Sequence, residues 1–331
     1  MKSLCVAAAM LLATTGLAAA EPATLVVTSS NNPSGNQLLV YDTAGNLIQA
    51  APTGGLGGVA GNAGGIAATR DSIAVVNFQS ESVSIFDVTD AGVQFRQTIA
   101  TLSSPVSVAF GKDHLYVLGT TTVESHRLAG RDVTAAPDGS EALVVGDGSA
   151  AQVGALANAL LITEKSNVVE TVGLHGGAVS GPAEAVAIPP GSDTPLGLAT
   201  RGANGYVTIA HSDEVGLVKN GELIALTGSG TQHAPCWLAL VGAYLYSSNS
   251  PSHSISRYVV SGAAVTLDEP VVASTAGAPT DISSSGRSVA VLDGGGQTHL
   301  TQFDVDDAGD LHLRAVSLVV NGANGVVVVE R

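Results

Sequence analysis

The sequence predicts an all-β fold, a seven-bladed β-propeller built from four-stranded antiparallel blades. Three observations lead to this prediction. Short runs of Val, Ile, Leu and Thr alternate with turns rich in Gly, Ser, Asn and Asp, which is typical of strands and hairpins. The chain holds 40 glycines and only 12% charged residues, and it has few segments with helical periodicity. The third observation is an internal repeat.

The repeat is clearest between residues 86–92 (FDVTDAG) and residues 303–309 (FDVDDAG), which begin 217 residues apart. That offset equals five repeats of about 43 residues, the length of one propeller blade. Each copy is an apolar strand that ends in an Asp/Gly turn, which supplies a tight hairpin to the next strand.

The strands of each blade can be placed in order. Seven short apolar segments at broadly even intervals are predicted second strands: residues 25–27, 73–76, 115–118, 160–163, 207–210, 244–246 and 289–292. The inner strands that precede them are predicted at 65–69, 106–110, 153–156, 196–200, 237–241 and 280–284. The N-terminal blade has no inner strand of its own, so we predict that residues 326–330 pair with it. This pairing would close the ring and remove two exposed sheet edges.

The N-terminus is typical of a secretory signal peptide, with Lys2, an apolar run over 4–17 and the small residues Ala18, Ala19 and Ala20. We therefore expect residues 1–20 to be a signal peptide and residues 21–331 to form a single propeller domain, secreted or periplasmic. No later stretch of about 18 continuous apolar residues is present, so no membrane span is predicted.

Charge and cysteine content narrow the possible partners. The formal charge is −15, and it becomes −16 without residues 1–20, which makes nucleic acid or an anionic membrane an unfavourable partner. Cys5 lies in the signal peptide, so Cys236 remains alone and no intramolecular disulfide can form. We expect a monomer.

Several motifs resemble a known group of proteins. Asn77 after the second strand of blade two, residues 161–165 (LITEK) and residues 234–237 (APCW) are similar to secreted members of the seven-bladed lactonase and carboxymuconate-cyclase-like propellers, the YVTN-type superfamily. The resemblance implies the propeller fold over the whole mature chain and a ligand in the axial funnel. Lactonases of this group commonly carry Arg or His just after the Pro that opens an inner strand.

That cationic residue is missing from this chain, because Val106, Leu196, Cys236 and Thr280 follow the corresponding prolines. A phosphorylated or polycarboxylate substrate is therefore disfavoured. A neutral or weakly charged ligand fits the sequence better.

The candidate site lies on one face of the ring, where the loops between second and third strands and the loops between blades surround the funnel. Glu164, Glu214 and His233 are the candidate acid/base groups, because opening a lactone needs one group that takes a proton and one that returns it. The alternative is that these three are solvated rim residues. The candidate ligand-binding residues are Asn77, Gln152, Thr194, Gln232, Cys236, Asn249 and Asn324.

Other sequence features favour structural roles. Cys236 is either a nucleophile near His233 or a buried small hydrophobe beside Trp237. The Asp-rich segment 304–310 fails as a calcium loop, because Ala308 and Ala315 occupy two of the ligand positions. The glycine-rich segment 54–65 is followed by no helix, so we expect a flexible inter-blade loop and not a phosphate site. The histidines lack zinc spacing and no G-x-S-x-G motif is present, so no metal or cofactor is predicted.

Two functions remain open at this stage. The first is an exported propeller that binds a small molecule or a protein partner in its funnel without catalysis. The alternative is a hydrolase or isomerase that acts on a neutral cyclic ester, with the three acid/base candidates as its catalytic groups. The fold does not decide between them, because propellers host unrelated activities.

Overall fold

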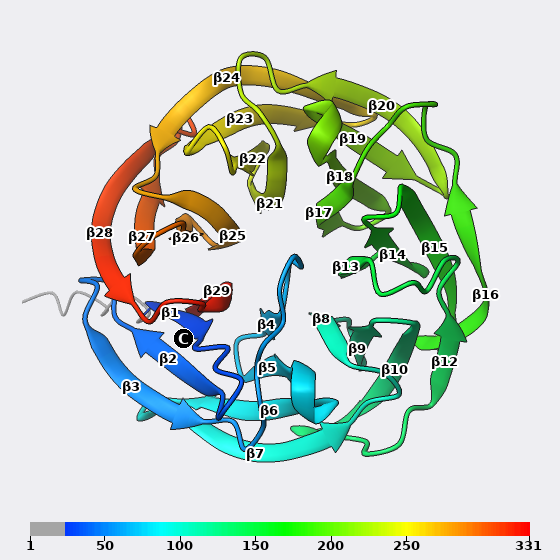
Figure 1. Cartoon of the computed structure of the whole chain (residues 1–331), viewed down its shortest axis with the longest axis vertical. Coiled ribbons are helices and arrows are strands. Elements are labelled where there is room, and N and C mark those ends of the chain that lie inside the picture. The colour runs from blue at the N-terminus through cyan, green and yellow to red at the C-terminus, as the bar shows by residue number, and fades with distance from the viewer. Residues whose placement is uncertain (1–23) are drawn as a thin grey trace, which may run out of the picture.

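The computed structural model describes residues 24–331, so the predicted signal peptide lies outside the described residues. Seven antiparallel sheets are arranged in a ring around a central axis (Figure 1). Six sheets have four strands and the third has five, because its outer edge is divided between β11 and β12. Two short 3₁₀ helices, η1 (Phe78–Ser80) and η2 (Ala210–Ser212), follow the second strands of blades two and five. The predicted fold class is confirmed.

The strands of each blade, from the axis outward, have the following bounds. Blade one holds β29 (Asn324–Glu330), β1 (Thr24–Ser29), β2 (Gln37–Tyr41) and β3 (Leu47–Pro52). Blade two holds β4 (Ile66–Ala68), β5 (Ser72–Asn77), β6 (Ser82–Thr89) and β7 (Gly92–Ala100). Blade three holds β8 (Pro105–Phe110), β9 (His114–Gly119), β10 (Thr122–Ala129), β11 (Asp132–Val133) and β12 (Gly139–Ala142). Blade four holds β13 (Ala150–Ala155), β14 (Ala159–Glu164), β15 (Val168–His175) and β16 (Ala178–Val186).

Blade five holds β17 (Pro195–Arg201), β18 (Asn204–Ile209), β19 (Glu214–Lys219) and β20 (Glu222–Gly228). Blade six holds β21 (Pro235–Val241), β22 (Tyr244–Asn249), β23 (Ser254–Ser261) and β24 (Ala264–Ser274). Blade seven holds β25 (Ala278–Ser285), β26 (Ser288–Gly294), β27 (Thr298–Val305) and β28 (Leu311–Val319). Every predicted inner and second strand overlaps one of these strands.

The ring closes through the C-terminal strand. β29 pairs antiparallel with β1, with Thr24 opposite Glu330 and Leu25 opposite Val329, and it is the innermost strand of blade one (Figure 1). The four valines 326–329 are all buried. The predicted closure is confirmed: the pairing covers the inner edge of β1 and gives β29 a partner.

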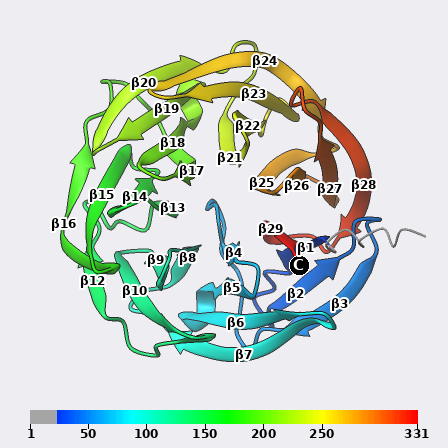
Figure 2. The same ribbon diagram turned by 180° about the vertical axis from the view of Figure 1, so that it is seen from behind.

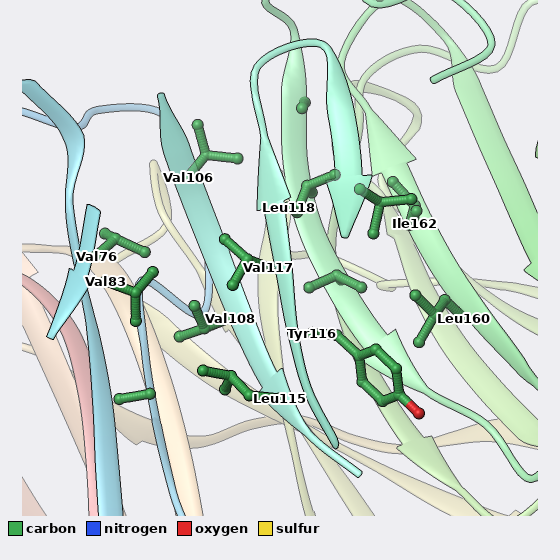
Figure 3. Packing of buried hydrophobic residues seen from close by; sticks show 14 of the residues in the cluster. Val76, Val83, Val106, Val108, Leu115, Tyr116, Val117, Leu118, Leu160 and Ile162 are labelled. Atoms are coloured by element: carbon green, nitrogen blue, oxygen red, sulfur yellow. The ribbon is translucent and has the colours of Figure 1, made fainter. Parts of the chain in front are cut away.

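The core lies between the blades, so strands are covered on both faces and are apolar on both. In β14, Leu160 and Ile162 belong to a cluster shared with blades two and three, whereas Leu161 packs in a different cluster toward blade five. Figure 3 shows the first cluster, with Val76, Val117 and Leu160 from three successive blades. A strand that is buried on both faces appears in sequence as a continuous apolar run, which is why the segments 160–162 (LLI) and 289–292 (VAVL) predict strands without strict alternation.

The two faces of the ring differ in their connections. Loops between second and third strands meet the inter-blade connections on one face, as when Gln79 N donates to Leu56 O at 3.2 Å. We call this the loop face, and we call the opposite one, which carries the remaining hairpin turns, the turn face. Within residues 24–331, no helix is long and apolar enough to cross a membrane.

Candidate functional site

The glycine-rich connection from β3 to β4 occupies the middle of the loop face. Its last part, residues 58–65, reaches the centre of the ring in both views (Figures 1 and 2). Val59, Asn62 and Ala63 are buried. The segment is an inter-blade connection, as predicted, but it is packed against the blades and not a loose loop. We call residues 58–65 the plug.

Hydrogen bonds from three other blades hold the plug. The donor and acceptor pairs are Trp237 Nε1 to Asn62 O (3.1 Å), Lys165 Nζ to Gly61 O (2.6 Å), Asn62 Nδ2 to Val106 O (2.5 Å) and Ala63 N to Ala151 O (3.1 Å). Burial lowers the pKa of Lys165, and the nearby carboxylate of Asp147 opposes this effect. These bonds join segments far apart in the sequence, so they fix the plug across the axis.

The seating of the plug depends on a close backbone approach at Gly57. Its N–H donates to Asn32 O at 2.9 Å, and a Cβ atom on Gly57 would overlap the backbone carbonyl group of Asn31. Only glycine fits here without a shift of one backbone segment. The Asn31 side chain adds a second attachment, since its Oδ1 accepts the N–H groups of Gly58 (2.8 Å) and Val59 (3.0 Å).

A cleft of about 710 Å³ opens on the loop face beside the plug. It lies between the β1–β2 loop, the plug and the loop that leads into β29, and Trp237 and Thr280 complete its wall. None of the described residues that line it is ionisable. Its polar groups are amides, hydroxyls and one indole, contributed by Ser30, Asn31, Asn32, Asn62, Trp237, Thr280, Asn321 and Asn324.

A second cavity of about 390 Å³ follows the axis and is lined by the inner strands of all seven blades. Gly64 lines this cavity, whereas residues 58–62 line the cleft, so the plug separates the two spaces. Asp281 is the ionisable residue of the axial lining; its carboxylate accepts the backbone N–H groups of Ile282 (2.9 Å) and Val326 (3.2 Å). Burial raises the pKa of Asp281 to about 7.

The three candidate acid/base residues lie on the loop face but outside both spaces. Glu164 is fully buried at the end of β14, where its carboxylate accepts the N–H groups of Val145 (3.0 Å) and Gly146 (2.9 Å). Glu214 begins β19 and is half-buried. The imidazole of His233 is 71% exposed, and its Nδ1 lies 2.8 Å from Asp213 Oδ2. Among the described residues, no hydrogen bond or ion pair connects Glu164, Glu214 and His233 with one another.

Asn77 and Asn249 end the second strands of blades two and six and are fully buried. Each amide donates to two serines on the next strand, with the shorter bond at 2.8 Å in both blades. The partners are Ser82 and Ser84 for Asn77, and Ser254 and Ser256 for Asn249. Both amides therefore brace their blades from within. The shared spacing N-x₄-S-x-S is the signal in the sequence that would have revealed this role.

Some of the other ligand-binding candidates make hydrogen bonds within the protein, and others line the axial cavity or the cleft. Gln232 Oε1 accepts from Ser254 at 2.6 Å, and Thr194 Oγ1 lies 2.9 Å from His211 Nδ1. Cys236 is buried, and burial raises the pKa of its thiol to about 12, which removes the thiolate that nucleophilic attack needs. Gln152 lines the axial cavity and Asn324 lines the cleft.

Sequence reasoning missed most of the cleft. Asn32, Asn321, Trp237 and Thr280 were not among the candidates, although all four contribute polar groups to its wall. The runs NNP at 31–33 and NGAN at 321–324 were the available signal. They meet only because β29 closes the ring beside β1.

The sequence matches no protein-family model and no curated protein. Solved structures resemble the fold. A candidate 6-phosphogluconolactonase from Bacteroides uniformis has a TM-score of 0.68 at 17% identity, covering 93% of this chain and 100% of the other. A second, from Bacteroides fragilis, gives 0.65 at 16% identity, with coverage of 96% and 100%.

A protein from Lactobacillus plantarum gives a TM-score of 0.67 at 17% identity, covering 94% of this chain and 100% of that one. The likeness extends over nearly the whole of each chain, and identities this low establish a shared fold alone. The chain therefore shares its propeller fold with these three solved structures.

Proposed function

We propose that this protein is an exported, non-catalytic propeller that binds a neutral, polar small molecule in the loop-face cleft. The observation that carries the proposal is the chemistry of the lining, in which amide, hydroxyl and indole groups face a space of about 710 Å³ with no ionisable residue among those described. A cleft without cations gives an anionic ligand no compensation for its lost hydration. A cleft without acids or bases offers no proton transfer.

The free hydrogen-bonding groups narrow the class of ligand. The side chain of Asn31 is already hydrogen-bonded to the plug, and Asn62 Nδ2 already donates to Val106 O. The Nδ2 groups of Asn32 and Asn321 have no partner in the described structure and can donate to a ligand. Trp237 adds an aromatic surface to the wall. Two amide donors beside an indole suit a compact ligand with carbonyl or ring oxygens, such as a neutral lactone or sugar.

Trp237 also provides the assay, because it is the single tryptophan of the chain. Its fluorescence is titrated with glucono-δ-lactone, methyl glucoside and their 6-phosphorylated counterparts. We expect a saturable change with a neutral compound only. Asn321→Ala should weaken that binding about fivefold through the loss of one hydrogen bond worth about 1 kcal/mol.

The matched control is Asn158→Ala, which removes an exposed asparagine on the turn face and should bind as the wild type does. A preference for the phosphorylated compounds, or no saturable change with any neutral one, would contradict the proposal. Loss of binding in both variants would assign the signal to general destabilisation and not to the cleft.

Export is proposed from the basic, apolar and small-residue order of residues 1–20. The full chain is expressed with its own N-terminus in a bacterium with an outer membrane, and the mass of the product in each fraction is measured. A periplasmic or extracellular product that starts near Glu21 is expected. An intact chain retained in the cytoplasm would contradict export.

One observation supports a second candidate, a hydrolase or isomerase that acts on a neutral lactone. Asp213 holds Nδ1 of His233 while the rest of the imidazole is exposed, and an imidazole oriented by a carboxylate is a common general base. The imidazole also helps to lower the pKa of Asp213, although burial of the carboxyl is the largest influence and acts in the opposite direction. Hydrolysis of neutral lactones that falls at least tenfold in both His233→Gln and Glu214→Gln would support this candidate; no turnover by the wild type would eliminate it.

A further inference from the structure

Three arginines meet at a hollow on the turn face, opposite the cleft. The hollow has a volume of about 320 Å³ and lies beneath blades one to three. Arg70 comes from the β4–β5 turn, Arg131 from the β10–β11 turn and Arg331 from the residue after β29. Segments from three adjacent blades, one to three, thus place three guanidinium groups around one space.

These arginines differ from most others in the chain, because they have no carboxylate partner. Five arginines form ion pairs with aspartates: Arg96, Arg127, Arg257, Arg287 and Arg314. No ion pair within residues 24–331 involves Arg70, Arg131 or Arg331. In a protein with a net charge of −15, three unpaired guanidinium groups at one hollow are not a by-product of composition.

Arg331 is held in place, and its Nη2 group has no hydrogen-bond partner within the described residues. Its Nη1 donates to Thr89 O (3.1 Å) and Asp90 O (3.0 Å), which fixes the group against the β6–β7 turn. Its Nε is shielded from solvent and has no hydrogen-bond partner in the structure. Because Nε is shielded, the Nη2 group is the donor of this guanidinium that remains for an oxygen of a phosphate or carboxylate.

The surrounding groups favour a small anion over a polyanion. Asp71 and Asp90 also line the hollow, so its side chains carry a net charge of +1. An adjoining hollow of about 520 Å³ shares Arg70 and Arg331 and adds Ser285, whose hydroxyl can donate to a further oxygen, together with Glu330. The flanking carboxylates and the acidic surface repel nucleic acid, whereas a hollow of about 320 Å³ has room for one tetrahedral oxyanion.

We propose that this turn-face hollow is a binding site for a phosphate group, as inorganic phosphate or as a small phosphate monoester. Nη2 of Arg331 donates to one oxygen, and Arg70 and Arg131 contribute the remaining positive charge. The site is separate from the loop-face cleft and does not depend on the function proposed for it.

The test is calorimetric titration of the intact protein with inorganic phosphate in a low-salt, phosphate-free buffer. We expect saturable binding with a stoichiometry of one. Arg70→Ala and Arg131→Ala should each weaken it at least tenfold, and neither side chain makes a hydrogen bond in the described structure, so both variants should fold. Arg331→Lys should weaken it similarly, since lysine keeps the charge but loses the guanidinium group that Thr89 O and Asp90 O hold in place.

Arg201→Ala is the matched control, because Arg201 lies on the same face without an ion pair and outside both hollows. It should bind phosphate as the wild type does. No saturable binding by the wild type, or an equal loss in Arg201→Ala, would overturn the proposal. Co-sedimentation with phosphatidylcholine vesicles that contain phosphatidic acid distinguishes a lipid headgroup; binding to those vesicles without binding to inorganic phosphate would also overturn it.

Discussion

Val329→Ala tests the closure of the ring and has a magnitude that follows from the structure. Val329 is 2% exposed, pairs with Leu25 across β29 and β1, and packs in the cluster that contains Leu25, Val27 and Phe86. The substitution removes two carbon groups worth about 0.8 kcal/mol each and leaves a cavity, so we expect a loss of about 2–3 kcal/mol. In a domain of this size, that corresponds to a fall in Tm of about 3–5 °C.

The assay is thermal and urea unfolding followed by circular dichroism, with Val316→Ala as the control. Val316 lies on β28 and is 52% exposed, so its truncation should change stability by less than about 0.5 kcal/mol. Deletion of residues 322–331 removes all four buried valines of β29, a loss comparable to the whole stability of a domain, about 5–15 kcal/mol. Equal Tm values for Val329→Ala and Val316→Ala, or a truncated chain with the wild-type Tm, would refute the closure argument.

Three further predictions concern buried polar groups. Asn77→Ala should lower the free energy of unfolding by about 2–3 kcal/mol in urea titrations, because it removes the buried hydrogen bonds of the amide with Asn36, Thr53 and Ser84; a change below about 0.5 kcal/mol would remove the bracing role. Asp281 and Glu170 both have pKa values raised to about 7, chiefly by burial, so the folded state holds protons that the unfolded state releases near pH 4. Stability should therefore fall by about 1 kcal/mol per pH unit for each group as pH rises from about 4 to 7, and Asp281→Asn should remove its share; a urea midpoint that rises with pH would contradict this sign. Cys236, with its thiol pKa near 12, should resist iodoacetamide in the native protein at pH 8, and labelling at the rate of the unfolded chain would show an accessible thiol.

The fold could be predicted from the sequence because its signals are local. Short apolar strands, Asp/Gly hairpins and a repeat near one blade length are each visible within a few dozen residues. The closure followed from counting strands, since the N-terminal blade lacked an inner one. The divided outer edge of blade three, β11 and β12, carries no comparable periodicity and was not predicted.

The candidate site was harder to predict, because its decisive contacts are not local. Asn62 and Trp237 are 175 residues apart, and nothing in the segment 54–65 by itself indicates that it fills the axis. The position of Asn77 at the end of a strand suggested a funnel residue. The side chain points instead into the blade, where Asn36, Thr53 and Ser84 satisfy it. Burial with internal partners therefore distinguishes bracing residues from ligand residues, and the pattern of residue types alone does not reveal it.

The plug is the feature on which the proposed cleft depends, and acrylamide quenching of Trp237 fluorescence measures it most directly. Trp237 is 8% exposed and is bonded to the plug through Asn62, so quenching of the wild type should be weak. Gly57→Ala should raise the quenching constant severalfold. The added Cβ cannot fit against the Asn31 backbone, so the plug must move away from Trp237 and expose the indole to acrylamide. Gly35→Ala is the control on the same face, where a Cβ meets nothing within 4 Å. Strong quenching in Gly57→Ala with weak quenching in the wild type and Gly35→Ala is the predicted result; three equal constants would contradict the plugged ring.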